Sequence, residues 1–120
     1  MKFFVSVLAL TFTFGAYAGQ REDAARIERL NMKVKRLSMR NLSCRHDSDC
    51  TVLPVGSRAC GGPSSFTMTS KFNRQFERLE RVIARTTARE EEYNIKYHVV
   101  SSCIAVMPPV PVCENSMCKM

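Results

Sequence analysis

Six cysteines limit how this chain of 120 residues can fold. They form two groups of three, on either side of a long stretch without cysteine: Cys44, Cys50, Cys60, Cys103, Cys113 and Cys118. We expect at least one disulfide to join the two groups, closing a loop of more than 40 residues and stabilising the fold by about 3 to 5 kcal/mol. The number and spacing of the cysteines leave the connectivity open.

Residues 1–18 are typical of a cleavable secretory signal peptide. Lys2 supplies the positive charge of the n-region, and residues 3–14 form the apolar stretch. Ala16-Tyr17-Ala18 forms a small-x-small cleavage site. The prediction is a mature chain from Gly19 in a periplasmic or secreted location, where disulfides form and persist. The apolar stretch is shorter than the roughly 20 residues that span a bilayer, so we expect no transmembrane segment in the mature form.

Residues 19–42 predict a basic amphipathic helix. Its apolar positions, Ile27, Leu30, Val34 and Leu37, recur at helical spacing. Its candidate partner-binding residues are the basic ones: Arg26, Arg29, Lys33, Lys35, Arg36 and Arg40. Three interpretations stay open: an arm on an anionic envelope surface or acidic protein, a seam for dimerisation, or a helix that packs on its own domain with solvated charges. Nucleic acid is not expected as a partner, because no aromatic residues are interleaved with the basic ones.

Residues 43–120 predict a disulfide-stabilised domain. A short strand at residues 51–53 enters a long loop that ends near Ser65, and a second helix runs from an N-cap at about Ser70 to Asn94. The apolar positions of this helix also follow helical spacing: Phe72, Phe76, Leu79, Ile83 and Thr86. With the first helix, the predicted fold is α+β: two helices against a small antiparallel sheet, stapled by disulfides.

The last segment combines a β-rich run over residues 97–106, a proline-rich break, and a hairpin turn at Asn115-Ser116. Two or three short strands fit this pattern. A two-residue turn at that point places Cys113 opposite Cys118, close enough for a local disulfide. The alternative pairs one of these two cysteines with Cys44 or Cys50.

Residues 54–65 form a loop anchored by Cys60 that offers Arg58. A rigid loop with an arginine could enter the specificity pocket of a trypsin-like protease, so a serine-protease inhibitor is the alternative function. The run Gly61-Gly62-Pro63 is also typical of an ordinary turn without a binding role, and this simpler interpretation stays open.

Neither a metal site nor an enzyme is predicted. His46, Asp47 and Asp49 match no zinc or calcium spacing, and Asp49 is better explained as a turn or capping residue that accepts a backbone N–H. An even number of cysteines leaves no free thiol as a nucleophile, and the two histidines belong to no catalytic motif. We therefore expect no catalytic residue, no metal and no cofactor.

The chain also resembles a group of small exported bacterial cysteine-rich proteins without assigned activity. The resemblance extends over residues 44–120, about three quarters of the mature chain. The residues that carry it are Cys44, Asp47, Asp49, Cys50, Ala59, Cys60, Gly61, Gly62, Pro63, Pro109, Pro111, Cys113 and Cys118. The resemblance implies a shared disulfide scaffold and a periplasmic or secreted location, and it transfers no functional residue. The predicted function is that of a small exported binding or interaction module for an unknown protein or an anionic envelope component.

Overall fold

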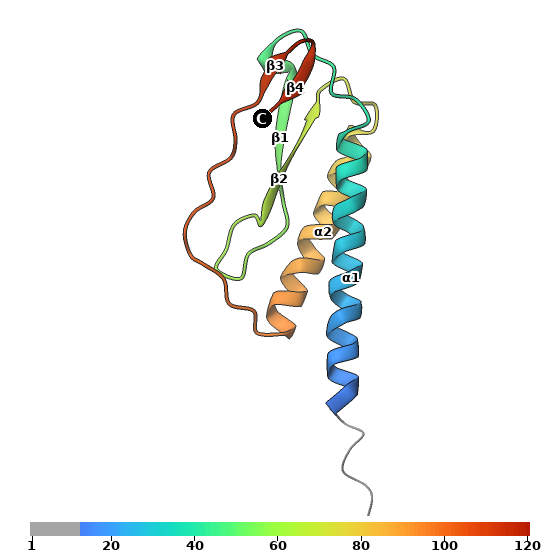
Figure 1. Cartoon of the computed structure of the whole chain (residues 1–120), viewed down its shortest axis with the longest axis vertical. Coiled ribbons are helices and arrows are strands. Elements are labelled where there is room, and N and C mark those ends of the chain that lie inside the picture. The colour runs from blue at the N-terminus through green and yellow to red at the C-terminus, as the bar shows by residue number, and fades with distance from the viewer. Residues whose placement is uncertain (1–12) are drawn as a thin grey trace, which may run out of the picture.

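The computed structural model describes residues 13–120 and has the predicted α+β fold (Figure 1). Two helices lie side by side, and two antiparallel sheets of two strands each lie beside them. Residues 1–12, most of the predicted signal peptide, lie outside the described residues, so the signal stays a prediction. Neither described helix has the length and apolar character needed to cross a bilayer.

The first helix, α1, spans Thr13–Ser38 and belongs to the same folded unit as the cysteine-containing part. It ends four residues before the predicted end at 42, where the Ser38 hydroxyl donates a hydrogen bond to the Lys35 carbonyl at 2.8 Å. Its residues Val34 and Leu37 are buried in the main core, together with Val55. The later part of the apolar seam of α1 is thus covered within its own chain, whereas Ile27 is only half-buried.

The second helix, α2, spans Phe76–Lys96 and runs antiparallel to α1. The predicted start at Ser70 was wrong. Ser70 ends a strand, and its hydroxyl donates to the Ser43 carbonyl and accepts the N–H of Phe72. Serine satisfies a turn in the same way as it caps a helix, which is why the sequence pattern misplaced the start. Phe72 consequently lies outside the helix and is 47 % exposed, whereas Leu79 is fully buried.

The main sheet pairs β1, Cys50–Val55, with β2, Ser65–Ser70. The strand predicted at residues 51–53 is confirmed as the middle of β1, and β2 was not predicted. The loop between them takes positive φ at Gly56, Gly61 and Gly62, which the absence of a Cβ permits. The main core lies between this sheet and the two helices, because Val55 of β1 packs with Leu79 and Val82 of α2.

The predicted strand content of residues 97–106 was wrong. Residues 97 and 98 form a turn directly after α2. Residues 99–111 form no strand and run along the outside of the molecule. Val100 is 92 % exposed and Ile104 78 %. A β-prone segment forms a strand only when it pairs with another strand, and residues 99–111 pair with none among residues 13–120.

The predicted hairpin is confirmed. Strand β3, Val112–Glu114, pairs with β4, Met117–Lys119, and the turn residues Asn115 and Ser116 have φ of 54° and 61°. Two consecutive positive φ values are the signature of a tight type I′ turn.

All three disulfides join the two cysteine groups, as expected for at least one of them: Cys44–Cys113, Cys50–Cys118 and Cys60–Cys103. The partners are 69, 68 and 43 residues apart along the chain. Of the two alternatives for the hairpin cysteines, the local Cys113–Cys118 disulfide is not formed, although these residues lie opposite each other, and the pairing with Cys44 or Cys50 is confirmed. Each reaches instead to a cysteine near the start of β1, which fastens the C-terminal hairpin onto the main sheet.

Candidate functional site

Four of the six predicted basic residues line one shallow depression. Arg26, Arg29, Lys33 and Arg36 of α1 surround a hollow of about 380 Å³ together with Arg89 of α2. These four residues recur at steps of three and four, which places them on one side of the helix. Arg40 lies in the turn after α1, and Lys35 lies on the other side of the helix and lines a different cavity.

Arginines of α2 extend this surface. Arg89 borders the depression, and Arg85 and Arg78 follow at steps of four and seven, so they share its side of α2. Because α1 and α2 run antiparallel and side by side, their two basic rows meet. We call this surface the basic face and define it by seven residues: Arg26, Arg29, Lys33, Arg36, Arg78, Arg85 and Arg89. The sequence pattern singled out only the α1 row as a candidate, although the helical spacing of the α2 arginines is also visible in the sequence.

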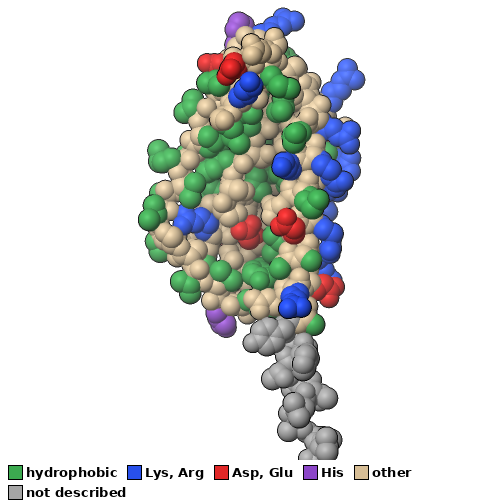
Figure 2. Space-filling view, in the orientation of Figure 1, with side chains coloured by type: hydrophobic (Ala, Val, Ile, Leu, Met, Phe, Trp, Pro, Cys, Tyr) green, Lys and Arg blue, Asp and Glu red, His purple; other side chains and the backbone are tan. Residues whose placement is uncertain are grey.

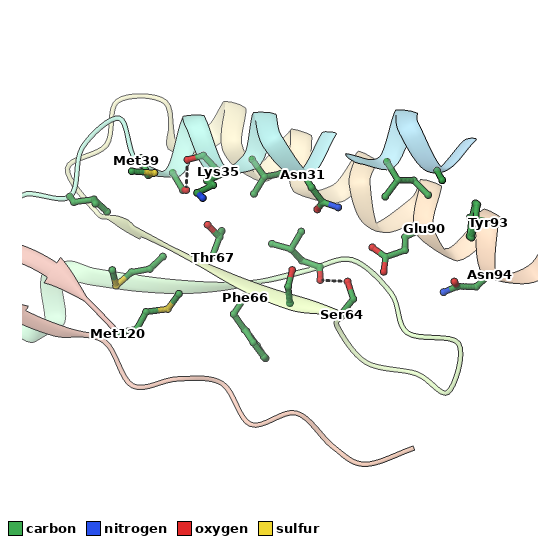
Figure 3. Close-up of a pocket in the computed structure, with 18 residues that line it drawn as sticks. Asn31, Lys35, Met39, Ser64, Phe66, Thr67, Glu90, Tyr93, Asn94 and Met120 are labelled. Carbon is green, nitrogen blue, oxygen red and sulfur yellow. Dashed lines mark hydrogen bonds between the residues drawn. The ribbon is translucent and has the colours of Figure 1, made fainter. Parts of the chain in front are cut away.

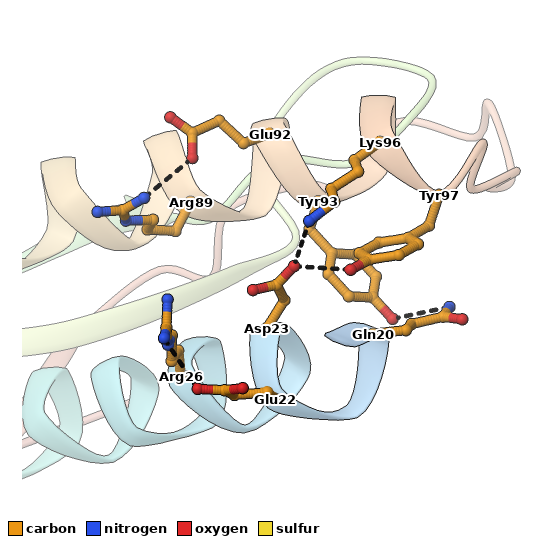
Figure 4. Close-up of polar contacts among 9 residues, drawn as sticks. All are labelled: Gln20, Glu22, Asp23, Arg26, Arg89, Glu92, Tyr93, Lys96 and Tyr97. Carbon is orange, nitrogen blue, oxygen red and sulfur yellow. Dashed lines mark hydrogen bonds and ion pairs between the residues drawn. The ribbon is translucent and has the colours of Figure 1, made fainter. Parts of the chain in front are cut away.

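Acidic side chains neutralise only one end of the basic face. Arg26 pairs with Glu22 at 2.9 Å and Arg89 with Glu92 at 3.2 Å, both on the surface (Figure 4). Within residues 13–120, Arg29, Lys33 and Arg36 form no ion pair. Figure 2 shows the resulting row of lysine and arginine side chains along the α1 edge of the molecule.

A polar cluster fixes the helices at this same end (Figure 4). Tyr97 Oη and Lys96 Nζ both donate to the Asp23 carboxylate, at 2.7 and 3.0 Å. The Tyr97 hydrogen bond, followed by that of Lys96, lowers the pKa of Asp23, and the bond to Asp23 raises the pKa of Tyr97. Gln20 also donates to the Tyr93 hydroxyl at 3.2 Å. These contacts join the N-terminal half of α1 to the end of α2 and fix the position of one helix against the other.

A larger groove of about 790 Å³ lies on the other side of α1, between this helix, β2 and α2 (Figure 3). Ile27 and Val34 of α1 form part of one wall, and Phe66 and Met68 of β2 form part of another. Met39, Met68 and Met120 come together here from three distant parts of the chain. The sequence showed no clustering of the methionines, because only the fold creates it.

The predicted inhibitory residue Arg58 lies against its own chain. Its guanidinium donates hydrogen bonds to the carbonyls of Ser102 and Ile104. The Cys60–Cys103 disulfide and a hydrogen bond from Cys60 N–H to the Ser101 hydroxyl hold the same two segments together. Inhibition of a protease through Arg58 stays a prediction, and it requires this side chain to leave both carbonyls.

The acidic residues between Cys44 and Cys50 have structural partners. Asp49 Oδ2 accepts the backbone N–H groups of Arg45 and His46 at 2.8 and 3.1 Å, which confirms the predicted capping role. Its other oxygen pairs with Lys71 at 2.7 Å, and the Lys71 hydrogen bond is the main cause of its lowered pKa. Asp47 accepts the N–H of Cys113 at 2.7 Å and so tethers β3.

The sulfur atoms of Cys44, Cys50 and Cys118 also lie close together, but each belongs to a disulfide. They therefore offer no thiolate to a metal ion.

No family model, curated protein or solved structure matches this chain. The resemblance to small exported bacterial proteins therefore stays a prediction. The fold defines the class of protein: a small α+β domain in which three disulfides join two groups of cysteines, as expected of a protein that folds in an oxidising compartment.

Proposed function

We propose that this protein is a periplasmic or secreted binding module that associates with an anionic surface of the cell envelope through its basic face. The observation that carries the proposal is one depression lined by four basic residues of α1 and by Arg89 of α2. An acidic protein is the alternative partner of the same face.

The electrostatics of the face support this proposal. Like charges on adjacent helices repel each other, and a partner with several negative groups relieves that repulsion. From Arg26 to Arg36 the α1 row is about 15 Å long at the helical rise, so it can contact several anionic groups at once. The contacts lie on a solvated surface, so added salt should weaken them.

Substitution tests the basic face better than deletion of α1. Removing the helix also removes Val34 and Leu37 from the core, so a shortened chain would lose its fold together with its charge. We therefore choose Arg29→Gln with Lys33→Gln and Arg36→Gln, none of which forms an ion pair within the described residues. The charge control is Arg21→Gln with Arg45→Gln and Lys119→Gln, which removes the same charge from exposed positions elsewhere and breaks only the surface ion pair of Lys119 with Glu114 at 3.8 Å.

The measurement is co-sedimentation with vesicles of phosphatidylcholine alone or mixed with phosphatidylglycerol. We expect wild type and control to bind the mixed vesicles and to release in high salt, and the basic-face variant to bind at least about tenfold more weakly. Equal binding by both triple variants, or binding that salt leaves unchanged, would contradict the proposal. Retention on immobilised polyglutamate but not on mixed vesicles would assign the face to an acidic protein instead.

A further inference from the structure

Strand β2 has an open edge. In its antiparallel ladder with β1, Phe66 lies opposite Pro54 and Met68 opposite Val52. Ser70 lies four residues after Phe66 and two after Met68. Its N–H points away from β1 and donates to the Asn41 carbonyl at 3.2 Å. Hydrogen-bonding direction alternates along an antiparallel strand, so the backbone groups of Phe66 and Met68 also point away from β1. Pro54, which has no N–H, fits this register.

Those backbone groups are unpaired and face the groove. Within residues 13–120, the N–H and C=O groups of Phe66 and Met68 have no hydrogen-bond partner outside the ladder. Figure 3 shows Thr67 pointing toward the helices and Phe66 pointing away from them, so the groove extends along both sides of the strand edge. An unpaired strand edge beside an apolar groove is the geometry that recognises extended peptides by strand addition.

The charges in the groove give the peptide a direction. Lys35 lies toward the Met39 end and Glu90 toward the Asn94 end (Figure 3). Neither forms an ion pair among the described residues. A strand antiparallel to β2 runs from the Lys35 end to the Glu90 end, because β2 begins beside Glu90. Charge complementarity therefore favours an acidic residue at the start of the peptide and a basic residue at its end.

We propose that the β2 edge binds an extended segment of a partner protein, which adds to the sheet as an antiparallel strand. The backbone of the segment pairs with Phe66 and Met68, and its alternate side chains contact Ile27 on one side and Met120 on the other. Its acidic end lies at Lys35 and its basic end at Glu90. This site does not include the basic face, so the two proposals can fail separately.

The first test measures fluorescence anisotropy of a labelled peptide, acetyl-Asp-Val-Thr-Val-Thr-Lys-amide, which has no net charge. A second peptide carries N-methyl groups on the backbone nitrogens that face β2. We expect the loss of these donors to weaken binding about tenfold or more. Equal binding of the two peptides would show apolar contact without strand pairing and would overturn the proposal, as would absence of binding by the parent peptide.

Protein variants test the same contacts from the other side. Met68→Pro removes an N–H that plays no part in the ladder with β1, just as Pro54 lacks an N–H on the neighbouring strand. We expect this variant to bind the parent peptide about tenfold more weakly. Glu90→Lys should weaken binding of the parent peptide and remove its preference over a peptide with the two charged ends exchanged, because both ends of the groove are then basic. The matched control is Glu91→Lys, at an exposed position outside the groove. An unchanged preference in the Glu90 variant would overturn the assigned direction, even if Met68→Pro failed to fold.

Discussion

At the scale of single residues, Asp49 shows how a charge supports the turn before the main sheet. Its carboxylate is nearly buried, accepts two backbone N–H groups and pairs with Lys71. The hydrogen bond from Lys71, followed by that from the Arg45 N–H, lowers the pKa of Asp49 below its usual 3.8. The capping role could be predicted from local sequence. The ion pair could not, because Lys71 is brought to Asp49 only by the pairing of β1 with β2.

We expect Asp49→Asn to lower the free energy of unfolding at neutral pH, and this loss to shrink in acid. A carboxyl group whose folded-state pKa is lowered stabilises the fold above its ordinary pKa of 3.8 and loses this effect as the pH falls through the folded-state value. Urea unfolding across a pH series checks this for wild type, Asp49→Asn and the exposed control Glu80→Gln. A difference between wild type and Asp49→Asn that stays constant down to the lowest pH would refute the assignment.

At the scale of elements, the packing of α2 against α1 and β1 provides most of the main core. Leu79 is fully buried among Val34, Leu37, Val55 and Val82. We expect Leu79→Ala to cost about 2 to 5 kcal/mol in the free energy of unfolding, because it leaves a cavity where α2 meets its neighbours. Ile95→Ala in the same helix is the control: Ile95 is 70 % exposed, and a change of less than about 0.5 kcal/mol is expected. Denaturant unfolding with the disulfides intact measures both, and similar losses would show that α2 is not held through Leu79.

Elements with their own periodic pattern could be predicted from the sequence, and elements defined by distant partners could not. The periodic apolar patterns of both helices and the Asn115-Ser116 turn are local signals. The structure confirms the two helices and the turn, except that Phe72 lies outside α2. β2 is a short strand rich in serine and threonine, whose identity depends on β1. The basic face was half predicted, because the α1 row is visible in the sequence but its junction with the α2 row depends on antiparallel packing. The groove was not predicted at all, since its walls come from three elements.

At the scale of the whole molecule, the Cys60–Cys103 disulfide restrains the long segment of residues 99–111 that forms no strand. In the chain-entropy account, a bridge between residues 43 apart stabilises by about 4 kcal/mol. We expect Cys60→Ser with Cys103→Ser to lose stability of about this size and to become sensitive to proteases within residues 99–111. Urea unfolding and limited proteolysis measure the two effects. Cleavage of wild type and variant at the same rate would show that Arg58 and its carbonyl partners suffice to hold the segment.

The disulfide pattern also imposes an order on synthesis. A ribosome makes Cys44, Cys50 and Cys60 first, and the native partner of each is among the last 18 residues of the chain. No native bridge can close until most of the protein has been made. An oxidant that joins cysteines as they emerge would produce a wrong bridge between Cys44 and Cys50, so correct maturation depends on delayed oxidation or on an enzyme that reshuffles disulfides.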